Sequence, residues 1–314
     1  MKILRTNYIV FILLVVTVSS CFTGIENTKK ITNKDVEKVT QEKGLETLTE
    51  TSYNKIEVDS FPNWNSGKQF IVVDNNVKRL FSVSPDYDID TINLSGKTLE
   101  YLGYTEGNIL DNEPKINLKF TDGTNKFTYP TRKTIDEIKR QKLMLQVPFM
   151  IEIDLINKYQ RLLSGKSFFI RTPIWYNEKG EMIPGKKFIK VTINNIYPGD
   201  KVFPLKISFT TEYNNKAYLF MSTKQSSVHN RLFDNLFSES DLRLNYPLIS
   251  ETNWNHIING TVTLDMTKAE CQLSLGTPNT IQERPTNDGL QEYWFYSDGM
   301  YLVFFDGLLK QFRK

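Results

Sequence analysis

The sequence predicts an α+β protein, in which two β-rich modules joined by a helical segment precede a C-terminal domain of two helices and a three-stranded antiparallel sheet. Three observations predict this arrangement. Short runs of Val, Ile, Phe, Tyr and Thr alternate with turn residues over 61–131 and 165–249, as strands and turns do. An apolar stripe at helical spacing lies between them, within 132–164. From residue 250 to residue 314, two helical patterns precede three strand patterns.

Composition excludes several classes of function. The chain has 314 residues, 39% hydrophobic and 24% charged, which is ordinary for a globular protein. A net charge of +3 does not support nucleic-acid binding, which uses a strongly basic face. With only two His and two Cys, the chain has few ligands for a metal. We therefore expect no catalytic residues, no metal and no cofactor.

The N-terminus has the pattern of a secretory signal. Lys2 and Arg5 precede an apolar run from Tyr8 to Val18, which is too short to span a bilayer but fits the apolar core of a signal peptide. The run ends in Val18-Ser19-Ser20-Cys21, which resembles the lipobox of bacterial lipoprotein signal peptides. This resemblance implies removal of residues 1–20 and anchoring of the protein in a membrane through lipid on Cys21.

Two further points follow from that resemblance. Phe22, rather than Asp, follows the lipidated cysteine, which by analogy with such lipoproteins favours the outer membrane. An ordinary secretory signal with an incidental cysteine is the alternative. Residues 21–60 are rich in Thr, Lys, Glu and Asn and poor in aromatic residues, so we expect a lipidated flexible tether. Cys271 then has no partner for a disulfide and is expected in a helix as a small core residue.

The two β-rich modules share short motifs, which point to an internal duplication. The separation between matching motifs shrinks steadily along the chain. The modules are similar to bacterial Src-homology-type small barrels, and this similarity implies two small-barrel-like folds. The matched motifs are Gly67-Lys68-Gln69-Phe70 with Gly165-Lys166-Ser167-Phe168, Gly96-Lys97-Thr98-Leu99 with Gly185-Lys186-Lys187-Phe188, and Leu118-Lys119-Phe120 with Leu205-Lys206-Ile207.

The connector over 132–164 contains two helix signals. Thr134 and Glu137 have the spacing of a capping box, in which each side chain accepts a hydrogen bond from the other residue's backbone amide. Asp154 is expected to cap a second helix that ends before Gly165. The apolar stripe of this helix predicts packing on the second module rather than binding of a partner; it consists of Leu155, Ile156, Tyr159, Leu162 and Leu163.

The segment from 250 to 314 carries the most specific pattern. Thr267 and Glu270 form a second capping box, and Gly276 is expected to end that helix. The three predicted strands are Gln291–Tyr296, Met300–Phe305 and Leu308–Arg313.

This segment resembles the BamE (SmpA/OmlA) family of outer-membrane-assembly lipoproteins. The motifs that carry the resemblance are Met266-Thr267-Lys268-Ala269-Glu270, Leu275-Gly276-Thr277-Pro278 and Trp294-Phe295-Tyr296. The resemblance implies two helices packed on a three-stranded sheet, and a role in contacts between envelope proteins. Asp265 stands where the family usually has Gly, so the loop entering the helix differs.

Two apparent ligand motifs do not meet their requirements. The segments at Gly96 and Gly165 lack the first glycine of a phosphate-binding loop, because Thr91 and Gln160 occupy that position. The acidic residues Asp86, Asp88 and Asp90 begin like a calcium loop, but Thr91 and Lys97 occupy the positions that need Gly and Glu. We expect a solvated acidic loop there. Asp90-Thr91-Ile92 also resembles an O-glycosylation site of some bacterial envelopes.

Other side chains offer weaker candidates. His229 and His256 are the only histidines, and no nucleophile motif accompanies them. A triad assembled only in space would be invisible in sequence. Trp175, Tyr176 and Tyr197 lie in or beside loops of the second module, where exposed rings could stack on a glycan. Packing in the core is the alternative for these rings.

The sequence therefore predicts a non-catalytic, membrane-anchored envelope lipoprotein that makes protein–protein contacts. Its expected partners are the membrane, through Cys21, and an envelope protein. The alternative is a lipoprotein that binds peptidoglycan or another glycan through Trp175, Tyr176 and Tyr197.

Overall fold

The structure is a computed structural model that describes Tyr53, Ile56 and residues 59–82, 84–107, 114–140, 145–223, 231–286 and 289–313. All of them belong to the unit Leu48–Lys314. The predicted signal peptide, Cys21 and His229 lie outside the described residues, as does nearly all of the predicted tether.

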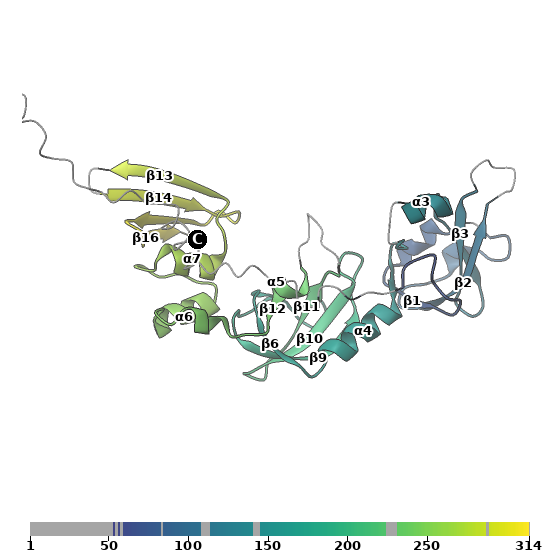
Figure 1. The fold of residues 1–314 in the computed structure, drawn as a ribbon, viewed down its shortest axis with the longest axis horizontal. Helices are drawn as coiled ribbons and strands as arrows, with labels where there is room; N and C mark the ends of the chain where they lie inside the picture. Colours follow the sequence, from purple (N-terminus) through teal and green to yellow (C-terminus); the bar gives the residue numbers. More distant parts are fainter. Residues whose placement is uncertain are drawn as a thin grey trace, which may run out of the picture. The chain divides into compact units, whose positions relative to one another are not determined.

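The predicted α+β class is wrong. The described residues form strands β1 to β16 in three antiparallel sheets, and the helices are short, with at most 11 residues in α4 (Figure 1). Three of the strands carry no recognisable alternation of buried and exposed residues, which is why sequence reasoning missed them. Two of these strands have only two or three residues, and the third is exposed along its whole length.

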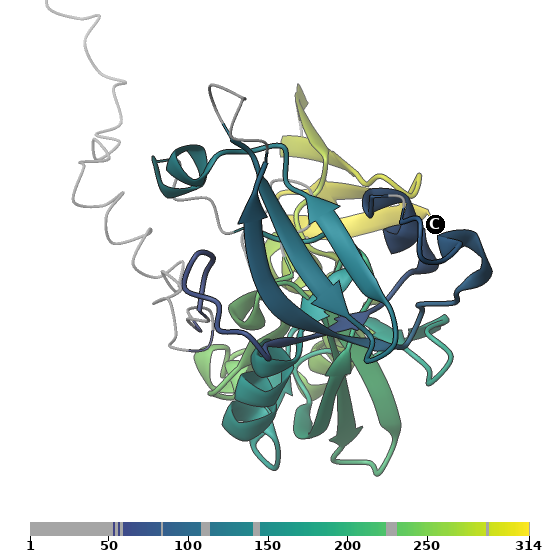
Figure 2. The same ribbon diagram turned by 90° about the vertical axis from the view of Figure 1, so that its right-hand side faces the viewer.

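The first sheet has the order β4-β3-β2-β1-β5 and is open rather than a barrel. Figure 2 shows its strands β2, β3 and β4 as a twisted sheet. The fifth strand comes from within the predicted helical connector, after the short helix α3 (Ile135–Arg140). The strands are β1 (Gln69–Val72), β2 (Thr98–Glu106), β3 (Ile116–Thr121), β4 (Lys126–Pro130) and β5 (Met150–Glu152).

The second sheet has the order β12-β6-β9-β10-β11-β7-β8 and is open as well. Neither module is therefore the small barrel that the sequence predicted, because the two end strands of each sheet do not pair with each other. Its strands are β6 (Ser167–Ile170), β7 (Ile174–Tyr176), β8 (Met182–Pro184), β9 (Lys190–Pro198), β10 (Leu205–Thr211), β11 (Lys216–Met221) and β12 (Phe237–Ser238), the last preceded by the one-turn helix α5 (Phe233–Leu236).

The two sheets contain the same four-strand unit, β1-β2-β3-β4 in the first and β6-β9-β10-β11 in the second. In each unit the second strand has nine residues, and its fifth residue, Leu102 or Asn194, is the unpaired residue of a β-bulge. The backbone amide of Gly67 donates to Tyr101 O over 2.8 Å, and that of Gly165 donates to Ile193 O over the same distance.

The hydrogen bonds also correct the motif alignment of the two modules. The amide of Gly96 donates to Val72 O, and the corresponding donor in the second unit is Phe188, which bonds Ile170 O. The sequence pairing had matched Gly96 with Gly185 instead. Both true counterparts have a positive φ, 78° for Gly96 and 59° for Phe188. A positive φ usually indicates glycine. Because Phe188 occupies this position in the second unit, the sequence motif of Gly96 had no matching glycine there.

Helix α4 (Ile153–Leu163) follows β5 directly and packs on the second sheet, as the apolar stripe predicted. Its buried residues Ile156, Tyr159 and Leu163 join the core of that sheet. The expected cap is wrong, because Glu152 occupies the N-cap position and Asp154 lies within the first turn.

The C-terminal domain contains α6 (Glu251–Ile258), α7 (Lys268–Leu275) and a sheet of order β13-β14-β15-β16. The predicted three-stranded sheet is thus wrong by one strand, β13. Both hydrogen bonds of the Thr267–Glu270 capping box are present, and those of the Thr134–Glu137 box are as well. The strands are β13 (Thr280–Thr286), β14 (Gly289–Phe295), β15 (Tyr301–Phe305) and β16 (Leu308–Arg313).

Lys187, in the loop before β9, ties the second sheet to the C-terminal helices. Its ammonium donates to the carbonyls of Leu273 and Ser274 at the end of α7, and its backbone amide bonds Ile258 O at the end of α6 over 3.0 Å. A cation is favourable at helix C-termini, where carbonyls lack helical partners. Burial nevertheless lowers the pKa of Lys187 to about 8.

This buried lysine predicts a specific dependence of stability on pH. The pKa of Lys187 is about 8 in the folded chain against 10.5 for an ordinary lysine, so the unfolded chain binds more protons between these values. The contribution of Lys187 to stability should therefore rise with pH across that window. Urea unfolding near pH 8, 9 and 10 should show the wild type gaining stability relative to Lys187→Met, and Lys190→Met, at an exposed position, is the control for the loss of a lysine as such. A flat or falling Lys187 difference would contradict the burial of its charge.

Candidate functional site

The three predicted glycan-binding rings do not form one surface. Trp175 is only 6% exposed, donates from Nε1 to Thr172 O over 2.9 Å, and packs edge-on against Phe209. Tyr176 and Tyr197 lie on the opposite, outer face of the second sheet, as the pairing of β7, β11, β10 and β9 shows. Sequence reasoning could not separate Trp175 from its neighbour, because adjacent strand residues point to opposite faces.

Cations already cover much of that outer face. The Arg231 guanidinium lies 5.9 Å from the ring centre of Tyr176, and Lys206 lies 4.6 Å above the ring of Tyr218. Of the three predicted residues, Tyr197 alone is well exposed, at 39%. The arrangement therefore offers a sugar little free aromatic surface.

The structure also shows the contacts of the other candidate residues that the sequence suggested. His256 Nδ1 lies 3.0 Å from Thr261 Oγ1, and Asp88 caps a short 3-10 helix (Ile89–Thr91) by accepting from the Asp90 amide. Cys271 lies in α7, fully buried, and burial raises the pKa of its thiol to about 12. Among the described residues, no group of three or more His, Cys, Asp or Glu side chains could hold a metal ion.

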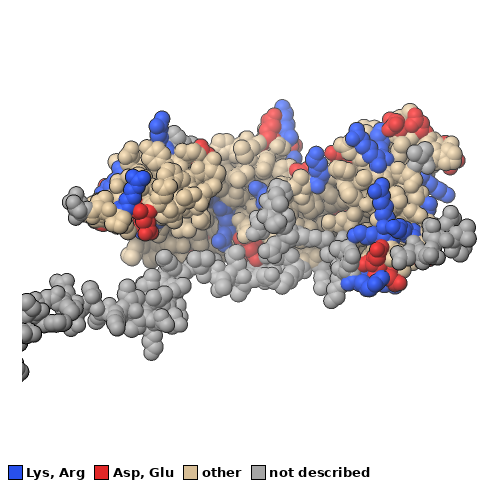
Figure 3. Space-filling model, turned by 90° about the horizontal axis from the view of Figure 1, so that it is seen from above, with Lys and Arg blue, Asp and Glu red and all other residues tan. Residues whose placement is uncertain are grey.

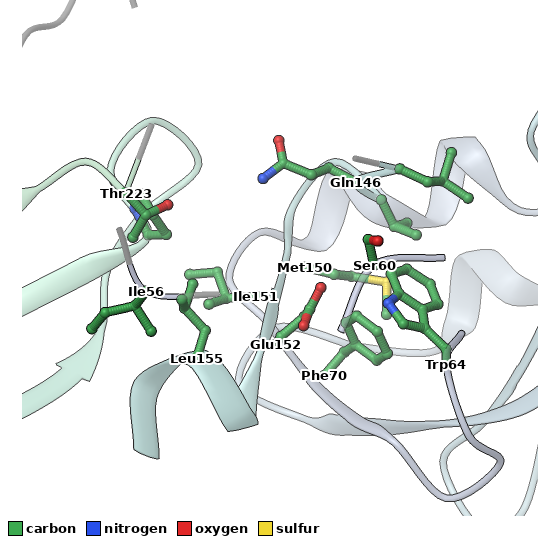
Figure 4. Close-up of a pocket in the computed structure, with 13 residues that line it drawn as sticks. Ile56, Ser60, Trp64, Phe70, Gln146, Met150, Ile151, Glu152, Leu155 and Thr223 are labelled. Carbon is green, nitrogen blue, oxygen red and sulfur yellow. The ribbon is translucent and has the colours of Figure 1, made fainter. Parts of the chain in front are cut away.

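A cavity of about 120 Å3 lies beside β1, β5 and the start of α4 (Figure 4). Its walls are mostly apolar and include Trp64, Phe70 and Leu155, and the Glu152 carboxylate points into it. That carboxylate is already bound, because Lys68 Nζ lies 3.0 Å from Glu152 and 3.1 Å from Asp154. The cavity thus combines apolar walls with an acid engaged in an ion pair.

The Lys68 ion pair ties β1 to β5 and α4. Only 5% of the Lys68 side chain is exposed. Burial by itself lowers the pKa of Lys68, but the hydrogen bonds and charges of Glu152 and Asp154 outweigh it, so the pKa is raised. A cation buried in this way is stabilised by its two carboxylates, and the carboxylate of Glu152, only 16% exposed, in turn depends on it.

Removing this cation should destabilise the fold. Lys68→Met leaves the Glu152 carboxylate buried without its partner, which costs on the order of 3–5 kcal/mol in comparable pairs. Lys97→Met is the control, because Lys97 is 49% exposed and lies 3.5 Å from Asp122, whose carboxylate also accepts hydrogen bonds from the backbone amides of Thr124 and Asn125. That pair should contribute about 1 kcal/mol or less. Equal losses in urea unfolding of the two variants would contradict a buried, interdependent ion pair.

The outer face of the C-terminal sheet is the second candidate surface. Strand pairing places three rows of four residues on this side, next to the Thr286–Gly289 pair at the hairpin end, and we call the twelve residues of these rows the aromatic face. The rows across the sheet are Arg284–Gln291–Phe305–Leu308, Gln282–Tyr293–Val303–Gln311 and Thr280–Phe295–Tyr301–Arg313.

Helices α6 and α7 pack on the other side of this sheet. Trp294, Leu302, Phe304 and Leu309 point to that side and share a core with residues of both helices. No residue of the aromatic face belongs to that core. Its four aromatic rings are nevertheless half-buried, and Val303 between them is only 5% exposed. The neighbouring side chains therefore form a tightly packed, partly apolar surface that no described helix covers.

The charges of this domain differ between its two sides. Lys268 and Lys310 pair with Glu292 and Asp265, each over 2.6 Å. On the aromatic face the charged residues are Arg284 and Arg313, and none of the twelve positions carries a carboxylate. Seen from above, the C-terminal domain at the left of Figure 3 shows mainly uncharged residues.

The sequence contains a signal from which this face could have been predicted. The predicted strands over 291–296 and 300–305 are apolar on both alternating sets of residues, including Tyr293 and Phe295 on one set and Trp294 on the other. In an antiparallel sheet covered by helices on one side, one set is normally polar. Apolar residues on both sets therefore indicate a second surface that is covered by something else.

Comparison with known proteins gives no relative: no family model, curated protein or solved structure matches the chain. The helices of the described residues are all too short or too polar to cross a membrane.

Proposed function

We propose that this protein is a non-catalytic envelope lipoprotein, anchored through lipid on Cys21 in the outer membrane, that binds a protein partner through the aromatic face. The lipobox pattern Val18-Ser19-Ser20-Cys21 supports the anchor. The aromatic face supports the partner.

One observation supports the partner: a packed apolar surface that no element of the described residues covers. Tyr293, Phe295, Tyr301 and Phe305 surround a buried Val303, and Leu308 extends the surface at 38% exposure. Aromatic residues and arginine are enriched at the centres of protein interfaces. An aromatic ring buries a large area at the cost of only two side-chain torsions. Contiguous apolar surface of this kind usually marks an interaction site.

The glycan-binding alternative has less support. Its main ring, Trp175, packs in the core of the second sheet, and Tyr176 stacks beneath Arg231. The aromatic face brings four half-buried rings together on one side of a sheet, and it lies in the domain whose sequence resembles an assembly lipoprotein family.

The partner site is testable by crosslinking in cells. A photoreactive amino acid at Gln282, which is exposed on the aromatic face opposite Tyr293, should give a defined crosslinked protein. The same probe at Lys179, exposed on the β7–β8 turn, should not. Tyr301→Ser and Leu308→Ser should each lower the yield about fivefold or more, since each removes apolar contact area. Thermal unfolding of each variant checks that it folds, and a yield indifferent to both changes would contradict the proposal.

The anchor has its own test. Metabolic labelling with palmitate should mark the wild-type protein and not Cys21→Ser, which should leave the membrane fraction. Labelling that persists in Cys21→Ser would refute lipidation at this residue.

A further inference from the structure

We infer that the partner segment bound by the aromatic face is acidic, with two carboxylates that pair with Arg284 and Arg313 on either side of an apolar centre. This inference rests on the proposed function and names the chemistry of the partner.

The positions of the two arginines are the first step. They occupy opposite corners of the face, Arg284 beside Gln291 on the row that ends at Leu308, and Arg313 beside Tyr301 on the far row. The apolar residues lie between them. Any segment that covers the apolar centre along this diagonal therefore meets a guanidinium at each end.

Neither arginine has an ion pair among the described residues, although both lysines on the other side of the domain do. Arg284 lies 5.1 Å over the ring of Tyr293, which orients its guanidinium against the face. A guanidinium stacked on a ring keeps its N–H donors in the plane, where they match a carboxylate. The side chain is thus oriented for an anion that the described chain does not supply.

The dimensions of the sheet set the spacing of the partner's acids. Three strand spacings of about 4.8 Å and four residues of about 3.3 Å separate the two corners, which gives a diagonal of roughly 20 Å. An extended segment covers this distance in about six residues. A helix covers it in about 13 residues.

Two other occupants fit these charges less well. A second copy that used the same face would bring four guanidinium groups together with no carboxylate among the twelve positions, which is repulsive. An anionic membrane surface is typically bound by clusters of about four to eight basic residues. The face has two arginines, and its centre consists of aromatic rings around Val303.

The test uses the full-length protein with the photoreactive residue at Gln282. Arg284→Glu and Arg313→Glu should each reduce the crosslinked yield about fivefold or more, because each replaces an ion pair with a repulsion. Arg284→Lys and Arg313→Lys should retain more of the yield. Arg161→Glu, at an exposed position of α4, is the matched control and should have no effect. Mass spectrometry of the adduct should find Asp or Glu within about 13 residues of the crosslinked position.

The outcomes separate this inference from the proposed function. If both Arg→Glu variants keep the full yield while Tyr301→Ser lowers it, the partner is not acidic and the inference fails alone. If Gln282 gives no adduct in the wild type, the proposed function and the inference both fail. Purified Cys21→Ser protein provides two further tests. Cosedimentation with phosphatidylglycerol vesicles that is lost in Arg284→Glu would identify a lipid surface instead. A dimer in sedimentation equilibrium that is lost in Tyr301→Ser would identify a second copy.

Discussion

In each four-strand unit the first strand pairs with a bulged second strand, and the contacts to neighbouring modules depend on the register of this pairing. In both repeats a glycine before the first strand, Gly67 or Gly165, bonds a carbonyl next to the bulge of the second strand. In the first repeat this places Lys68 where it meets the acids of β5 and α4. In the second repeat the turn before the bulged strand contains Phe188. Its ring stacks on that of Trp254 in the C-terminal domain, with 5.8 Å between the ring centres.

In the C-terminal domain the main contrast is between the two sides of the sheet. Its two helices have eight residues each and cover one side of a four-stranded sheet. On that side each cation is paired and even the carboxylate of Glu292 is buried with a partner. On the other side neither arginine has an ion pair with a described residue, and the aromatic rings are half-exposed. Buried charge is tolerated only when paired, as Glu292 is. The exposed arginines lie on the side for which we propose a partner.

Sequence reasoning succeeded where the signal was local. Both capping boxes form, α4 buries the expected stripe, and β16 spans Leu308–Arg313 as predicted. It failed where a strand carries no alternation of buried and exposed residues of its own. β5 and β12 are too short to show a pattern, and β13 is exposed throughout because only its backbone pairs with β14. These strands turned the predicted barrels and three-stranded sheet into larger open sheets.

By itself, the sequence determined the starts of α3 and α7, most strand positions and the lipobox on which the proposed anchor depends, because these are properties of neighbouring residues. The tertiary structure decided which motifs correspond between the repeats, since inter-strand hydrogen bonds match Gly96 to Phe188. It also decided that Trp175 is buried while Tyr176 and Tyr197 share the outer face. Last, it decided that Arg284 and Arg313 frame one aromatic surface, because strand register brings together residues far apart in the chain.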